Sequence, residues 1–142
     1  MTIKVKKLDE TAVLPARAHQ GDAGLDLCAN AETTIGPGEW ALIPTGVALA
    51  LPDGFEAQVR PRSGLAFKYG VTTLNSPGTI DAGYRGEIKA LMINHGKEPF
   101  TVKKGDRVAQ LVIAQVVQAE LEEAPELPGS ERGAGGFGST GA

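Results

Sequence analysis

The chain lacks the features that mark several large classes of protein. It has 142 residues and a single cysteine, Cys28, so it can form no intrachain disulfide. A reducing, cytoplasmic environment is therefore expected, with Cys28 as a small buried residue in an apolar run. No stretch of the sequence reaches the length of a membrane span. Met1 to Lys7 alternates charged and apolar residues and has no apolar core of a secretory signal.

Positive charge and clustered metal-binding side chains are scarce as well. The formal net charge is −3, so there is no basic excess to release counterions from a nucleic acid. Only two histidines are present, His19 and His95, and no His/Cys cluster suggests zinc. We expect both histidines at the surface. A small phosphorylated ligand remains compatible with this composition, because it needs only a few local arginines.

Glycine, by contrast, is abundant. It accounts for 19 of 142 residues, roughly double the ordinary share of about 7%, and there are 9 prolines. Many turns and short connections follow, which predicts one all-β domain. The β-rich and alternating runs predict strands at residues 3–7, 39–44, 47–51, 55–60, 71–74, 87–94, 100–102 and 107–117, with one or two helical turns at 63–69.

The end of the chain has an unusual composition for a free tail. Residues 132–141 combine one arginine, one aromatic ring and two adjacent hydroxyls, spaced by glycines. Glycine lets backbone N–H groups face an anion, Arg132 offers a forked donor to phosphate, and Phe137 offers a face for a base. A plain flexible linker is the alternative reading. We expect a core at residues 1–124, followed at 125–142 by a proline-containing linker and this tail.

Four segments in the body of the chain carry further polar residues beside glycine. Residues 22–27 form an acidic turn, 61–66 contain an Arg-Ser-Gly cluster, 78–87 hold a carboxylate and a phenol, and 105–112 run from a polar turn into a strand. Asp81 can orient a water for attack on a phosphoanhydride, because Asp carboxylates are ionised at neutral pH. Alternatively, Asp81 closes a turn. Each segment alone is weak evidence for a site.

Taken together and in order, these five segments resemble the five motifs of the deoxyuridine triphosphatase (dUTPase) family. The resemblance spans the chain from about Asp22 to Gly141. It implies a distorted jelly-roll barrel, a homotrimer with shared active sites, and hydrolysis of dUTP to dUMP and pyrophosphate. Mg²⁺ would assist attack at the α-phosphorus. The resulting activity supplies dUMP and keeps uracil out of DNA.

The resemblance also implies a role for individual residues. Asp81 would activate the hydrolytic water, Tyr84 would pack on the deoxyribose and exclude a 2′-hydroxyl, and Asp26 would serve Mg²⁺ through water. Arg107 would support the phosphate loop or be a solvated charge, and Lys68 and Arg85 are expected at the surface. The remaining substrate-binding residues would be Arg62, Ser63, Gly64, Asn75, Gln110, Arg132, Phe137, Gly138, Ser139 and Thr140.

Two other functions are compatible with these motifs. A deoxycytidine triphosphate deaminase shares the implied fold and triphosphate site, but the glycine-rich tail with Phe137 favours the triphosphatase. A non-catalytic nucleotide-binding protein on the same fold is the second alternative. The presence of Asp26, Asp81 and the tail argues against it.

Overall fold

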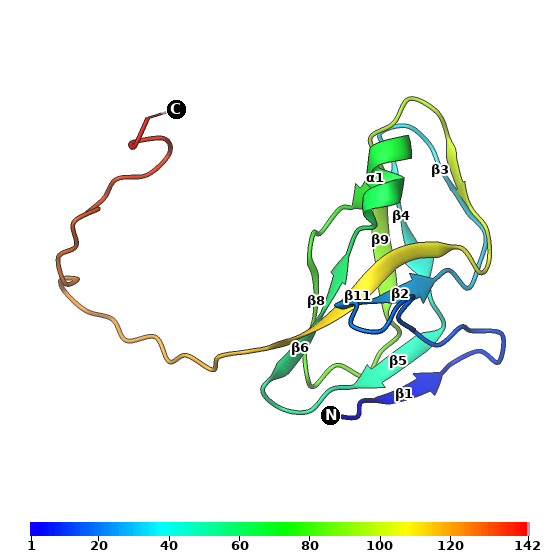
Figure 1. Ribbon diagram of the computed structural model, residues 1–142, viewed down its shortest axis with the longest axis horizontal. Helices are drawn as coiled ribbons and strands as arrows, with labels where there is room; N and C mark the ends of the chain where they lie inside the picture. Colours follow the sequence, from blue (N-terminus) through cyan, green and yellow to red (C-terminus); the bar gives the residue numbers. More distant parts are fainter. Residues whose placement is uncertain (142) are drawn as a thin grey trace.

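Short strands joined by tight turns dominate the computed structural model, which describes residues 1–141 (Figure 1). The all-β prediction is confirmed, and helix α1 lies where the helical turns were expected. The elements are β1 (Lys4–Lys7), β2 (Gly24–Cys28), β3 (Thr33–Ile35), β4 (Trp40–Pro44), β5 (Val47–Ala50), β6 (Phe55–Arg60), α1 (Ser63–Tyr69), β7 (Val71–Thr73), β8 (Gly78–Ile80), β9 (Lys89–Asn94), β10 (Phe100–Val102) and β11 (Arg107–Gln115).

The strands form four small antiparallel sheets. Their orders are β2-β11-β6-β8, β4-β9-β7, β1-β5 and β10-β3. Strand β11 lies between β2 and β6, where Gln110 is opposite Asp26 on one side and Arg60 on the other. Directly opposed residues in an antiparallel pair project to the same face. Polar residues that are far apart in the sequence therefore meet at one level of this sheet.

Inward-facing aliphatic side chains form the core. Val71, Ile88 and Val102 are fully buried, and the alternating pattern of the strands places their polar neighbours outside. Asn94 is also fully buried. Its amide donates to the carbonyls of Ile35 at 2.9 Å and Glu98 at 2.8 Å, so it joins β9 to the end of β3.

Several elements differ from the sequence-based expectations. Residues 24–28 form strand β2 rather than part of a turn, because pairing with β11 outweighs the turn preference of glycine and aspartate. The strands at 33–35 and 78–80 were not expected at all, and they pair with β10 and β6 respectively. Strand β11 ends at Gln115, two residues before the expected end.

The last part of the described chain leaves the barrel. After β11, residues 116–141 contain no helix or strand, and Figure 1 shows them running away from the sheets. Every side-chain and turn hydrogen bond of residues 130–141 stays within that segment. Phe137 is fully exposed, with a left-handed φ of 50°. The division into a core up to residue 124 and a functional tail beyond it stays a prediction.

Candidate functional site

Two guanidinium groups surround one carboxylate at the level of Gln110. Arg62 Nε lies 3.5 Å from one oxygen of Asp26, and Arg107 Nη1 lies 3.4 Å from the other. Arg62 also donates to the carbonyl of Arg107 at 3.0 Å. Gln110 donates to the carbonyl of Pro61 at 2.9 Å. These contacts hold the arginine cluster (Asp26, Arg62, Arg107 and Gln110) at one edge of the β2-β11-β6-β8 sheet.

Helix α1 starts beside this cluster. Arg62 is its N-cap, with an extended φ of −97°, and the exposed residues Ser63 and Gly64 follow in the first turn. The first N–H groups of a helix have no partner within it. Backbone donors, the Ser63 hydroxyl and two guanidiniums therefore share one neighbourhood, which favours an anionic ligand with several oxygens.

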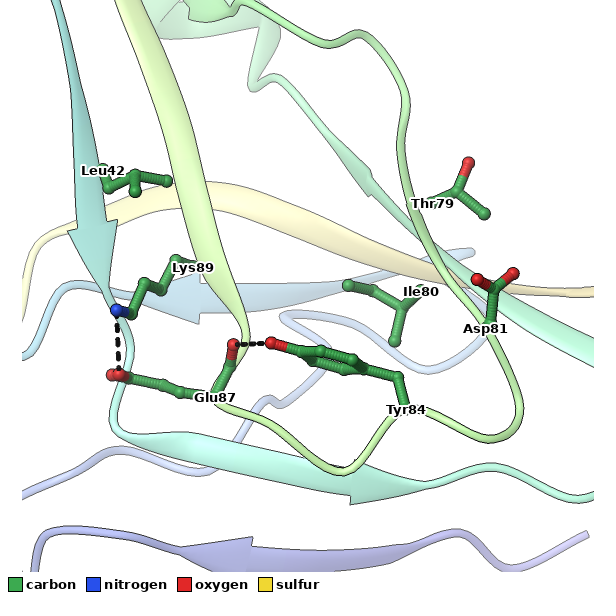
Figure 2. A pocket seen from close by; sticks show the side chains of 7 residues that line it. All are labelled: Leu42, Thr79, Ile80, Asp81, Tyr84, Glu87 and Lys89. Carbon is green, nitrogen blue, oxygen red and sulfur yellow. Dashed lines mark hydrogen bonds and ion pairs between the residues drawn. The ribbon is translucent and has the colours of Figure 1, made fainter.

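A second group of predicted residues surrounds the loop after β8. Asp81 and Tyr84 line a pocket of about 440 Å³ together with Leu42, Thr79, Ile80, Glu87 and Lys89 (Figure 2). Asp81 is exposed, so its carboxylate is available to solvent and ligand. The Tyr84 N–H donates to the Asp81 carbonyl at 3.0 Å, which closes the loop into a turn. Asp81 therefore closes a turn through its carbonyl and also presents an exposed carboxylate.

Glu87 fixes the far end of the Tyr84 side chain. The Tyr84 hydroxyl donates to the Glu87 carbonyl at 3.0 Å, and Figure 2 shows the ring extending from the loop toward this contact. The Glu87 carboxylate accepts the Gly46 N–H at 2.9 Å and lies 3.7 Å from Lys89 Nζ. The ring is thus tethered, although 45% of Tyr84 is exposed.

Asn75 lies on the other side of β8 from Asp81 along the chain. Its side chain is exposed, and its Nδ2 lies 3.0 Å from the position that a Cβ on Gly78 would occupy. Gly78 is opposite Val59 of β6, near the Arg60 end of that strand. Within one chain, Asn75 is therefore at the opposite end of β8 from Asp81.

The strand register separates Asp81 from Arg62. Ile80 is opposite Ala57, so Asp81 is about level with Glu56, four residues before the end of β6 at Arg60. Four residues of strand span about 13 Å, and Arg62 lies beyond Arg60. No hydrogen bond or ion pair among residues 1–141 links Asp81 or Tyr84 to the arginine cluster. The predicted residues form two separate surfaces in one chain.

Comparison with known proteins shows which family the chain belongs to. A sequence model of the dUTPase family matches residues 10–141. The chain belongs to the dUTPase family. It is 58% identical over 141 residues to the deoxyuridine 5′-triphosphate nucleotidohydrolase of Clostridium acetobutylicum, covering 99% of this chain and 97% of that protein. Identity to the enzyme of the same name from Nautilia profundicola is 57%, with 99% of both chains covered.

Solved dUTPase structures share the fold of the whole chain. A Staphylococcus bacteriophage 80alpha dUTPase with dUpNHpp is 31% identical, with a TM-score of 0.93 over 99% of both chains. A mutant dUTPase of phage phi11 of S. aureus, in which a structural Mg(II) ion is coordinated, is 28% identical with a TM-score of 0.83 over 89% of this chain and 98% of that one. The expected dUTPase-like all-β fold is therefore confirmed.

The described part of this dUTPase holds no preformed cluster of metal ligands. Residues 1–141 contain no cluster of three or more His, Cys, Asp or Glu side chains that could hold an ion. Burial raises the pKa of the Cys28 thiol, so Cys28 is a neutral buried side chain, as expected. His19, His95, Lys68 and Arg85 are exposed, also as expected. None of the described helices is long and apolar enough to span a bilayer.

Sequence reasoning left the role of Arg107 open between two alternatives and missed other residues of these surfaces. The ion pair with Asp26 shows that Arg107 is part of the arginine cluster rather than an isolated strand-end charge. The sequence shows acidic and basic residues in segments 22–27 and 105–112. Only the β2–β11 register shows that these residues lie next to one another. Leu42 and Lys89 reach the Tyr84 pocket through the β4–β9 pairing and gave no local signal, whereas Glu87 precedes β9 at the end of the 78–87 segment.

Proposed function

We propose that this dUTPase cleaves dUTP to dUMP and pyrophosphate by attack of water at the α-phosphorus, and that Asp81 activates the water. The observation that carries the proposal is an exposed carboxylate three residues before Tyr84, in a chain whose dUTPase match covers residues 10–141. A carboxylate in this position can orient a water and accept its proton. The reaction would supply dUMP in the cytoplasm and keep uracil out of DNA.

The pocket beside Asp81 would hold the nucleoside. The Tyr84 ring lines the pocket and is tethered at its hydroxyl, so it would pack against a deoxyribose and collide with a 2′-hydroxyl. Rejection by collision can exceed the loss of one favourable contact. Asn75 would bind the uracil with its amide, which both donates and accepts hydrogen bonds.

The arginine cluster would hold the phosphates. Arg62 would offer its guanidinium, Ser63 and Gly64 the donors at the start of α1, and Gln110 its side-chain amide. Asp26 forms ion pairs with both Arg62 and Arg107. On arrival of the triphosphate, Asp26 would keep these guanidiniums oriented while their remaining N–H groups donate to phosphate oxygens.

The Asp26 carboxylate is compatible with a Mg²⁺ ion that keeps most of its bound waters. A single half-buried carboxylate cannot enclose the ion, but Mg²⁺ characteristically keeps waters and takes further ligands from substrate phosphates. Asp26 would hold it through a water. When bound, Mg²⁺ would neutralise charge on the phosphates. The structural Mg(II) ion of the phage phi11 dUTPase is consistent with a magnesium requirement in the family.

We further propose that the active site is assembled between chains of a homotrimer. Asp81 is more than about 13 Å from Arg62 along β6 of one chain, so a single nucleotide would use Asp81 of one subunit and the arginine cluster of another. The tail makes no hydrogen bond to its own barrel in the described residues. It would cover a site with Arg132 on the terminal phosphate, Phe137 on uracil, and Gly138, Ser139 and Thr140 over the phosphates, excluding water from the closed site.

Pyrophosphate and ammonia release from purified protein tests this function. We expect pyrophosphate from dUTP, with much lower kcat/KM for the triphosphates of thymidine, deoxycytidine and uridine. Ammonia from deoxycytidine triphosphate would instead identify a deaminase. Tight dUTP binding without turnover would identify a non-catalytic binding protein. Comparable kcat/KM for UTP and dUTP would contradict the role of Tyr84.

A further inference from the structure

We propose that Gly86 and the carbonyl of Glu87 are positioning elements that hold the Tyr84 ring at the angle needed to reject a ribose. The inference rests on the proposed function, since it assigns the origin of sugar selectivity in that same pocket. It goes beyond Tyr84 itself, because neither Gly86 nor the Glu87 backbone needs to contact the nucleotide.

The absence of a side chain at Gly86 is what lets the ring occupy its position. A Cβ built on Gly86 would lie 2.6 Å from Tyr84 Cζ and 3.0 Å from Cε2, and closer still to the hydroxyl oxygen. These separations are well inside van der Waals contact. The φ of Gly86 is not in the left-handed region, so the backbone conformation at this position does not require glycine. The Tyr84 ring itself supplies the reason.

The neighbouring Gly83 provides the contrast within the same loop. It also lacks a left-handed φ, yet a Cβ there would meet nothing within 4 Å. A methyl group is therefore tolerated one residue before Tyr84 and obstructed two residues after it. The obstruction is specific to the ring and is not a general property of the loop.

The hydroxyl of the ring is held against a fixed acceptor. Tyr84 donates to the Glu87 carbonyl at 3.0 Å, and the Glu87 carboxylate accepts the Gly46 N–H at 2.9 Å. The next residue is bound too, because the Ile88 N–H donates to the Val47 carbonyl at 2.9 Å. The turn between β4 and β5 thus anchors the acceptor, and the acceptor anchors the ring.

A methyl group at position 86 would move the ring without unfolding the chain. Tyr84 is 45% exposed, so it can swing toward the pocket instead of compressing the core. That swing would break the bond to the Glu87 carbonyl and change the surface offered to the sugar. Displacements of about 1 Å in a substrate-positioning group can cost up to about a hundredfold in rate.

The test compares Gly86→Ala with the matched control Gly83→Ala in steady-state kinetics with dUTP and UTP. The measured quantity is kcat/KM for dUTP divided by kcat/KM for UTP. We expect Gly86→Ala to lower this ratio by about tenfold or more, because a displaced ring no longer rejects the 2′-hydroxyl and kcat/KM for UTP rises. Gly83→Ala should keep the ratio of the wild-type enzyme. An unchanged ratio in Gly86→Ala would overturn the proposal.

Two further variants separate ring position from general damage. In a Tyr84→Ala background, adding Gly86→Ala should not change the ratio further, because no ring remains to be displaced. An equal drop in that background would overturn the proposal. Tyr84→Phe keeps the ring and loses the bond to Glu87, so the ratio should fall about two- to tenfold. If Gly86→Ala does not fold, an unchanged ratio in Tyr84→Phe overturns the proposal. Wild-type protein without dUTP turnover would instead refute the proposed function.

Discussion

At the scale of single residues, Asp81 has a backbone held in a turn and a carboxylate that is exposed to solvent. Its carbonyl accepts the Tyr84 N–H at 3.0 Å, which fixes the turn, while its side chain is exposed beside the Tyr84 pocket. A carboxylate held in this way can orient a water without first losing much conformational freedom. Its contribution should therefore appear in the transition state rather than in substrate binding.

Replacing this carboxylate by an amide tests that assignment. Asp81→Asn keeps the size of the side chain but removes the base, so kcat for dUTP should fall about a hundredfold or more while nucleotide affinity stays near the wild-type value. Single-turnover kinetics and equilibrium titration with dUTP measure the two quantities separately. Near-normal turnover in the variant would mean that another group activates the water.

The sequence predicted which residues lie together where one local motif carries them. The Gly-bounded segment with Asp81 and Tyr84 could be recognised from its sequence, and the structure places both in one pocket. The pairing of Arg107 with Asp26 could not be recognised in the same way, because it depends on strand register across 81 residues. The support of Tyr84 by Glu87 depends on a backbone carbonyl, which no residue type reveals.

At the scale of elements, Asn94 joins three parts of the barrel. It is fully buried at the end of β9, donates to the carbonyls of Ile35 and Glu98, and accepts the Gly96 N–H at 2.8 Å. Buried polar groups are stabilising only while their partners are present. The side chain therefore fixes β9, the following turn and the end of β3 relative to one another.

Removing this amide should cost stability without changing the site. Asn94→Ala leaves two carbonyls and one N–H with no side-chain partner, so we expect roughly 2–4 kcal/mol less stability. Thermal unfolding at fixed protein concentration measures the change. Thr101→Ala is the control, because it loses only an exposed contact with Thr34 at 3.0 Å. Equal midpoints for the two variants would contradict the structural role of Asn94.

Element boundaries followed the sequence wherever apolar alternation was undisturbed. Strand β6 and helix α1 have the expected limits, because β-rich runs and an adjacent Arg-Ser-Gly start mark them. Strand β2 was mistaken for part of a turn, since Gly24 and Asp26 disfavour strands locally. Residues 24–28 form a strand because they pair with β11, which is far away in the sequence. The sequence of a single segment does not reveal such long-range pairing.

At the scale of the whole molecule, the two separated surfaces predict sites that are shared between subunits. Mixed trimers test this with two inactive chains: Asp81→Asn with an intact tail, and a chain truncated after Glu131 with Asp81 intact. If Asp81 and the tail of one site come from different subunits, random mixing should restore roughly a quarter of all sites, which is about a third of the sites in hybrid trimers. Pyrophosphate release from the co-expressed proteins measures the recovery.

Isolation with two different affinity tags ensures that only hybrid trimers are assayed. Each variant alone, expressed with both tags, is the matched control and should remain inactive. Hybrids that bind the nucleotide but show no recovery would place Asp81 and the tail of a site on the same chain. Failure to form trimers at all would contradict the shared-site arrangement itself.

The length of exposed chain between the barrel and Arg132 has a consequence for turnover. A flexible tether gives its end an effective concentration in the millimolar range around sites within reach. Tail residues could then bind the nucleotide with only millimolar intrinsic affinity and still cover an occupied site much of the time. Weak intrinsic affinity would also let the tail leave quickly once the products form. A long tether would thus combine frequent closure with rapid release, which a tightly docked lid could not do.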